Sequence, residues 1–166
     1  MILESPAKKH SGQSSFGEKF LPTVQRSARV PYSAQQMFDL VNDIESYPRF
    51  LHWCSGARVD VREADAVEAS LDVGLAGLHR TFKTRNTVLR PKSIAIALVS
   101  GPFKKLEGQW RFEDALDGGS TVSLDLLFEV ALSPFGAIFA RIFEEIASSQ
   151  MDAFIRRARE LYGRRE

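Results

Sequence analysis

The chain has 166 residues, of which 44% are hydrophobic and 26% are charged, and its formal net charge is +1. This length and composition predict one soluble globular domain, which buries about 70% of the surface that its unfolded chain would expose. The balanced charge excludes a protein that binds nucleic acid over its whole surface, although it permits a local basic patch.

The cellular compartment is indicated by features that the sequence lacks. A single cysteine, Cys54, excludes a disulfide within the chain and favours a reducing compartment. No apolar run reaches the roughly 18 to 20 residues that a membrane span needs. The first twenty residues lack the apolar centre of a signal peptide. We therefore expect a cytoplasmic protein, with a peripheral position at the inner membrane as the alternative.

The N-terminal part of the chain predicts a tail followed by a strand and two short helices. Residues 1–22 lack hydrophobic periodicity, and we expect a disordered tail there and one domain over residues 23–163. A strand is predicted over residues 23–30, and a helix over residues 34–42 with Ser33 as its N-cap. Pro48 then predicts a second short helix or an ordered turn.

The middle of the chain predicts a series of antiparallel strands. Apolar residues alternate with polar ones over residues 67–73 and again over residues 106–113. A further strand is predicted over residues 78–89, and residues 94–99, which are apolar on both faces, indicate a central strand. A hairpin signal at residues 117–120 precedes a last strand over residues 122–132.

After Ser133 and Pro134, apolar residues recur at steps of three and four and predict a helix of about 28 residues. A helix of this length beside a sheet with one apolar face should lie across that sheet.

Four separated segments carry a family resemblance in the same order. They are VPYSA at residues 30–34, MFDLVNDIESYP at 37–48, TFKTRN at 81–86 and GPFKKLEGQW at 101–110. Together they resemble the coenzyme Q-binding START-domain family, whose bacterial members include the ribosome association toxin. The resemblance implies an α+β, START-like helix-grip fold. In that fold an antiparallel sheet of about seven strands wraps around a long C-terminal helix, and two short helices follow the first strand.

The resemblance implies two different functions. One is the binding of ubiquinone or a related polyprenyl lipid, in a cavity between the sheet and the C-terminal helix, in support of respiration. The other is that of a toxin from a toxin–antitoxin pair, which binds the large ribosomal subunit, blocks subunit association and is opposed by a small antitoxin protein. The fold also hosts enzymes. A polyketide cyclase or aromatase is therefore a third alternative, with Asp72, Glu129 and Tyr47 as its candidate acid–base groups.

A ligand cavity in a protein is mostly apolar and contains a few polar groups. The inward positions of the predicted elements supply candidate lining residues, which are Tyr47, Phe50, Trp53, Phe82, Thr84, Asn86, Trp110, Phe112, Leu126, Phe128, Phe139, Ile142 and Ile146. Thr84 and Asn86 share a strand face with Phe82, so we expect one of them to form a hydrogen bond with a ligand carbonyl. The alternative is a packed core in which both polar groups bond to neighbouring side chains.

Two basic segments are candidate contacts with the large ribosomal subunit or with a membrane surface. The first is Phe103, Lys104 and Lys105 at the tip of a predicted hairpin, and the second is Arg156, Arg157 and Arg159 near the end of the long helix. Arginine suits phosphate in RNA and in lipid head groups. The alternatives are an ordinary turn whose aromatic ring packs on the core, and a solvated helix end whose charges match the helix dipole.

The sequence offers no motif for chemistry based on a metal, a nucleotide or a nucleophile. His10, His52 and His79 are far apart and lack metal-ligand spacing. No base can be identified for Cys54, and the chain has no phosphate-binding glycine loop. We therefore expect a binding protein without a cofactor.

Overall fold

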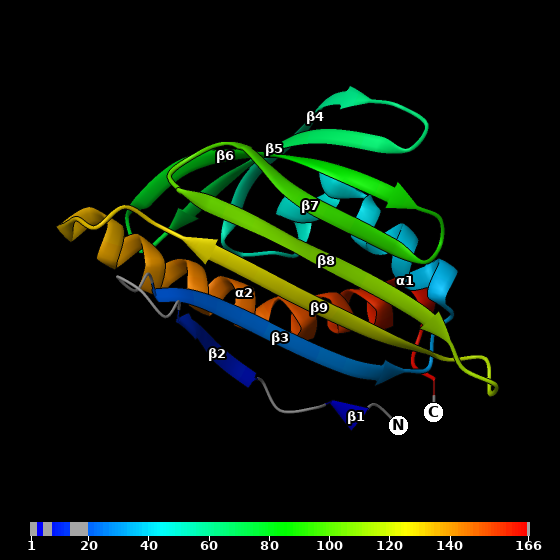
Figure 1. Ribbon diagram of the computed structural model, residues 1–166. Coiled ribbons are helices and arrows are strands. Elements are labelled where there is room, and N and C mark those ends of the chain that lie inside the picture. The colour runs from blue at the N-terminus through cyan, green and yellow to red at the C-terminus, as the bar shows by residue number, and fades with distance from the viewer. Residues whose placement is uncertain (1–2, 5–7, 14–19, 166) are drawn as a thin grey trace.

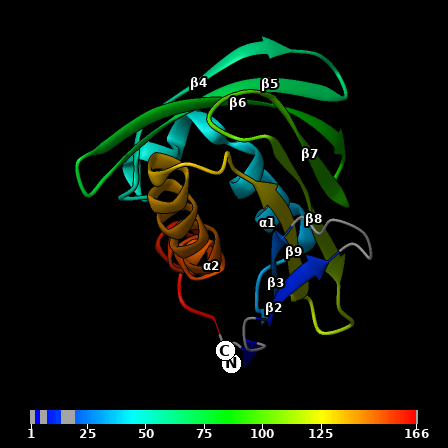
Figure 2. The ribbon, with the colours of Figure 1, turned by 60° about the vertical axis from the view of Figure 1, so that its left-hand side comes forward.

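A curved antiparallel sheet holds a long C-terminal helix, α2, against its concave face (Figures 1 and 2). The computed structural model describes residues 3–4, 8–13 and 20–165. The seven main strands lie in the order β3-β9-β8-β7-β6-β5-β4, so that every neighbouring pair except β3 and β9 is consecutive in the chain. This is the helix-grip architecture that the sequence predicts.

Six of the seven main strands follow the predicted segments in order, and the seventh, Cys54–Arg62, precedes the first segment predicted in the middle of the chain. The seven are β3 (Phe20–Val30), β4 (Cys54–Arg62), β5 (Ala66–Leu75), β6 (Leu78–Leu89), β7 (Ser93–Ser100), β8 (Lys105–Asp114) and β9 (Ser120–Glu129). Two shorter strands, β1 (Leu3–Glu4) and β2 (Lys8–Gln13), pair with β3. Within residues 1–22, where the sequence suggests a disordered tail, the structure describes these two strands and the start of β3. The rest of that range lies outside the described residues.

The first helix, α1 (Ala34–Asn42), has the predicted bounds because a capping box fixes its start. The Ser33 hydroxyl accepts the Gln36 N–H at 3.1 Å, and the Gln36 side chain accepts the Ser33 N–H at 3.0 Å. The segment around Pro48 forms a 3₁₀ helix, η1 (Ile44–Arg49), which confirms the second short helix. Both helices cover one end of the sheet (Figure 1).

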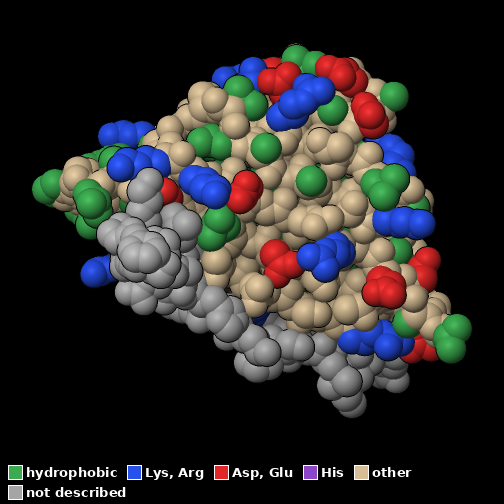
Figure 3. Space-filling view, in the orientation of Figure 1, with side chains coloured by type: hydrophobic (Ala, Val, Ile, Leu, Met, Phe, Trp, Pro, Cys, Tyr) green, Lys and Arg blue, Asp and Glu red, His purple; other side chains and the backbone are tan. Residues whose placement is uncertain are grey.

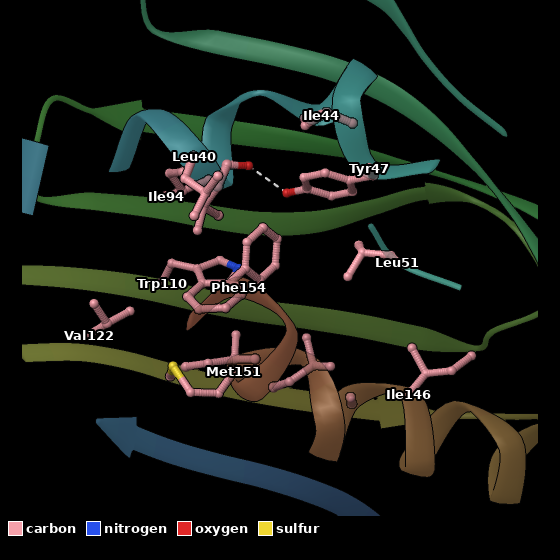
Figure 4. Packing of buried hydrophobic residues seen from close by; sticks show 14 of the residues in the cluster. Leu40, Ile44, Tyr47, Leu51, Ile94, Trp110, Val122, Ile146, Met151 and Phe154 are labelled. Carbon is pink, nitrogen blue, oxygen red and sulfur yellow. Dashed lines mark hydrogen bonds between the residues drawn. The ribbon is translucent and has the colours of Figure 1, made fainter. Parts of the chain in front are cut away.

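The long helix α2 (Pro134–Tyr162) begins as predicted, with the Ser133 hydroxyl accepting the Gly136 N–H at 2.9 Å. Its buried residues recur at steps of three and four and face the sheet; from Phe139 onward they are Phe139, Phe143, Ile146, Ala147, Met151, Phe154, Ile155 and Ala158 (Figure 4). Among the described residues, no helix combines the length and apolar character needed to cross a bilayer.

The C-terminal end of α2 is fastened beside α1. The Tyr32 hydroxyl donates a hydrogen bond of 2.7 Å to the carbonyl of Gly163, which follows the helix. The Tyr162 hydroxyl donates a hydrogen bond of 3.0 Å to the carbonyl of Gln36. These two bonds hold one end of α2 in place, while the opposite end begins at a loop after β9.

Candidate ligand-binding site

A cavity of about 90 Å³ lies between the sheet and α2 and is bordered by α1 and η1. Its lining residues are Val41, Ile44, Tyr47, Trp53, Ala69, Leu71, Phe82, Thr84, Asn86, Ile94, Ile96, Leu106, Trp110, Leu124, Leu126, Phe143, Ile146, Ala147 and Gln150. For comparison, an engineered protein cavity of about 150 Å³ binds benzene. A substituted aromatic ring therefore enters this space only if the surrounding elements move apart.

Eight of the predicted cavity residues line this space, namely Tyr47, Trp53, Phe82, Thr84, Asn86, Trp110, Leu126 and Ile146. The remaining five, Phe50, Phe112, Phe128, Phe139 and Ile142, do not. Three of these five are buried in the core, where other rings cover them. Phe112 packs against Phe38 of α1 at 5.7 Å between ring centroids, and Phe128 packs against Phe143 at 5.0 Å. The strand pattern correctly predicts that Phe112 and Phe128 point inward, but the rings packed against them separate them from the cavity.

Gln150 is the polar lining residue that sequence reasoning missed. It lies on α2 between Ile146 and Phe154, four residues from each, and so shares their buried stripe. This spacing is the signal that could have identified it. The neighbouring serines in the sequence make the segment look solvent-exposed.

Two side-chain amides are placed at the cavity wall with their oxygens already bonded. The Thr84 hydroxyl donates to Oδ1 of Asn86 at 3.0 Å. The indole Nε1 of Trp53 donates to Oε1 of Gln150 at 3.2 Å. The described residues make no other hydrogen bond to either amide. The NH₂ groups of Asn86 and Gln150 are therefore donors left for a ligand in an apolar setting.

Tyr47 borders the cavity, and its hydroxyl donates a hydrogen bond to the carbonyl of Val41 (Figure 4). Burial raises the pKa of this phenol above its ordinary value, and the nearby Cys54 and Asp43 raise it further. Asp72 and Glu129, the other candidate acid–base groups, are not among the lining residues. The described lining set contains no carboxylate, imidazole, thiol, ammonium or guanidinium group.

The loop between β7 and β8 turns its aromatic residue inward. Gly101 has φ of +143°, and a Cβ there would lie 2.6 Å from Cβ of Phe82, so the turn needs glycine. Phe103 is only 8% exposed and packs edge-on against Phe139 and Phe143, at 5.1 and 4.7 Å between ring centroids. Phe103 is therefore unavailable for the suggested surface contact, because its ring is part of the core.

The two basic segments lie near opposite ends of α2. Lys104 and Lys105 are exposed beside the end of β9, where the backbone N–H of Lys104 bonds to Glu129. Arg156 and Arg159 are exposed near the other end of the helix. Arg157 is half-buried, with its guanidinium over the Phe50 ring at 5.2 Å. The structure does not gather these cations into one patch.

Fold and cavity together define a class: single-domain helix-grip proteins with an apolar site under the last helix. The family of polyketide cyclases/dehydrases and lipid transport proteins matches residues 30–155. The ribosome association toxin RatA of Escherichia coli K12 is 41% identical over 148 residues, which are 89% of this chain and 94% of that protein. The chain belongs to this START-like family, in the branch that contains RatA and the coenzyme Q-binding proteins.

A second relative in that branch is the mitochondrial coenzyme Q-binding protein COQ10 homolog B of Xenopus laevis. It is 28% identical over 139 residues, which are 81% of this chain and 57% of that protein.

Among solved structures, the Zhui aromatase/cyclase of Streptomyces sp. R1128 has a TM-score of 0.73 at 15% identity, over 83% of this chain and 93% of that one. This likeness shows the fold alone. The 18 kDa protein CC1736 of Caulobacter crescentus has a TM-score of 0.64 at 30% identity, over 87% and 99% of the two chains.

Proposed function

We propose that this protein binds a hydrophobic molecule carrying hydrogen-bond acceptors, such as ubiquinone or a related polyprenyl lipid, in support of respiration. The observation that carries the proposal is the pair of amide groups, Asn86 and Gln150, whose oxygens are already bonded. Both NH₂ groups lie at the cavity wall without an acceptor among the described residues, so a ligand carbonyl can accept a hydrogen bond from them. The apolar walls contribute about 25 cal/mol for each Å² of ligand surface that they remove from water.

Binding, rather than catalysis, is the activity that suits this site. General acid–base catalysis needs a titratable group near the substrate. In the described lining set that group is limited to Tyr47, whose proton is bonded to a backbone carbonyl and whose pKa is raised by burial. The ligand enters by displacing the surrounding elements, because the space of about 90 Å³ is too small for a quinone ring.

Native mass spectrometry with organic extraction, on protein purified from its own host, tests this proposal. Ala147 lines the cavity, so Ala147→Leu fills it, whereas Ala64→Leu makes the same change at an exposed turn. We expect a quinone to co-purify with the wild type and with the Ala64 variant, but not with the Ala147 variant. A wild-type protein that is empty and takes up no added ubiquinone contradicts the proposal.

The second candidate function is that of a toxin that binds the large ribosomal subunit, blocks subunit association and is opposed by a small antitoxin. The 41% identity to RatA over almost the whole of both chains favours it. The exposed cations at either end of α2 supply phosphate contacts, and such an association weakens steeply with salt. Both functions place the protein in the cytoplasm, either at ribosomes or at the inner membrane.

Sedimentation with purified large subunits at several salt concentrations tests the second function. Lys104→Gln with Lys105→Gln, and separately Arg156→Gln with Arg159→Gln, remove the exposed cations from one end of the molecule at a time. We expect one pair to reduce both the affinity and its salt dependence. If the wild type does not co-sediment with large subunits at low salt, this function is ruled out.

A further inference from the structure

An exposed apolar segment lies where β9 passes into α2. Residues 130–140 contain no charged residue. Leu132, Phe135 and Ile138 are 99%, 37% and 59% exposed. The helical periodicity of the sequence places Phe135 and Ile138 on the buried face, yet neither residue belongs to the buried core cluster or lines the cavity. We call residues 131–138 the apolar tip.

Three cationic side chains lie on or near the apolar tip. The Arg80 guanidinium lies 4.2 Å from the centroid of the Phe135 ring. Lys104 is exposed beside the end of β9, and Arg141 is exposed one helical turn after Ile138. Figure 3 shows hydrophobic side chains gathered at the end of the molecule where α2 begins, with Lys and Arg side chains close to them. Exposed apolar groups bordered by positive charge are typical of peripheral membrane binding.

We propose that the apolar tip docks on an anionic lipid bilayer. Leu132, Phe135 and Ile138 enter the head-group region, and Arg80, Lys104 and Arg141 contact lipid phosphates. RNA also attracts the cations, but it leaves the exposed aliphatic side chains in water. An anionic bilayer accepts the apolar side chains among its acyl chains and binds the cations through its phosphates. This surface is separate from the cavity, so the proposal does not rest on the ligand.

A row of aromatic rings joins the apolar tip to the cavity. Phe135 stacks on Phe139, and Phe139 stacks on Phe143, each at 6.0 Å between ring centroids. Phe143 lines the cavity. Phe143 follows Phe135 by eight positions, which is about 12 Å along the helix, so docking brings the cavity wall within about two turns of the bilayer.

Vesicle flotation with the full chain tests the docking surface. The vesicles are phosphatidylcholine alone, or phosphatidylcholine mixed with phosphatidylglycerol. The tip variant is Leu132→Ser with Ile138→Ser, and the charge variant is Lys104→Gln with Arg141→Gln. Leu89→Ser with Leu116→Ser is the matched control, because both leucines are exposed and lie outside the tip.

We expect the wild type and the control to float with the anionic vesicles. The tip variant should lose at least about tenfold in partition coefficient, since two inserted side chains are removed. The charge variant should lose about fivefold for each cation on anionic vesicles, and should behave like the wild type on neutral ones. All substituted positions are exposed, and circular dichroism verifies that each variant folds.

Three results overturn the proposal. The first is a wild-type protein that does not float with anionic vesicles. The second is a tip variant that floats as well as the wild type. The third is a wild-type protein that does not bind vesicles but forms another association, which the tip variant abolishes. That association is either a dimer seen by light scattering or co-sedimentation with ribosomal subunits.

Discussion

The hydroxyl of Thr84 donates a hydrogen bond of 3.0 Å to the side-chain carbonyl of Asn86, two residues further along β6. Both side chains are buried on the same strand face as Phe82. The strand can carry two polar residues inward because they partly satisfy each other. One donor group, the NH₂ of Asn86, is left over, and it lies at the cavity wall.

Asn86→Leu removes this donor while keeping a side chain of similar size. We expect the Kd for a short-chain ubiquinone to rise about tenfold, as for the loss of one buried hydrogen bond. Isothermal titration calorimetry measures the change. Ser70→Ala is the control, because Ser70 is a buried polar residue outside the cavity, bonded to Asp60 at 2.6 Å. An unchanged Kd for the Asn86 variant removes Asn86 from the ligand site.

The redox state of a bound quinone should affect its affinity. The oxygens of Asn86 and Gln150 each already accept one hydrogen bond, from Thr84 and Trp53. A quinol hydroxyl therefore has to compete for the one remaining lone pair, whereas a quinone carbonyl meets NH₂ donors that have no partner among the described residues. We expect the oxidised form to bind about tenfold more tightly than the reduced form. Anaerobic titrations with the two forms of one short-chain ubiquinone compare them. Equal affinities would show that the site does not distinguish acceptors from donors.

The two ends of α2 should differ in dynamics. Tyr32 and Tyr162 tie the C-terminal end to the rest of the fold, whereas the first turns carry the exposed Phe135 and Ile138. We expect amide hydrogen exchange to be faster over residues 134–143 than over residues 151–162, and to slow at the first segment when ligand binds. Tyr162→Phe should lower the free energy of unfolding by about 1 kcal/mol without changing exchange at residues 134–143. Uniform exchange along α2 would contradict the view that a ligand enters by displacing the first turns of this helix.

Stability should fall in alkaline solution because of Cys54. Burial raises the pKa of this thiol from 9.0 to about 11. Above pH 9 the unfolded chain releases a proton that the folded chain retains, so the free energy of unfolding falls as the pH rises from 9 to 11. The raised pKa of Tyr47 acts in the same direction. Urea unfolding across this range should show a smaller decline for Cys54→Ala, and parallel curves for the two proteins would contradict the assignment.

Local signals in the sequence are enough to predict most of the elements. Ser33 with Gln36 fixes the start of α1, and Pro134 fixes the start of α2, because capping and proline act within one helical turn. The inward positions of Thr84 and Asn86 also follow from strand alternation. These features depend on neighbours in sequence, so the residues themselves reveal them.

Features that depend on distant neighbours could not be predicted. An amphipathic pattern does not show how far the opposing surface extends, which is why Ile138 fits the apolar stripe and is nevertheless exposed. Phe112 points inward as expected, but α1 covers it before it reaches the cavity. The hydrogen bond of Gln150 to Trp53 joins residues 97 positions apart, and no local pattern indicates it.

The buried ring of Phe103 links two parts of the molecule that look independent in the sequence. It touches Phe139 and Phe143 on α2, and the next two residues in its loop are the exposed Lys104 and Lys105. An outward movement of α2 that enlarges the cavity also removes the support on which this loop rests. The volume available to a ligand and the position of two surface charges are therefore mechanically coupled.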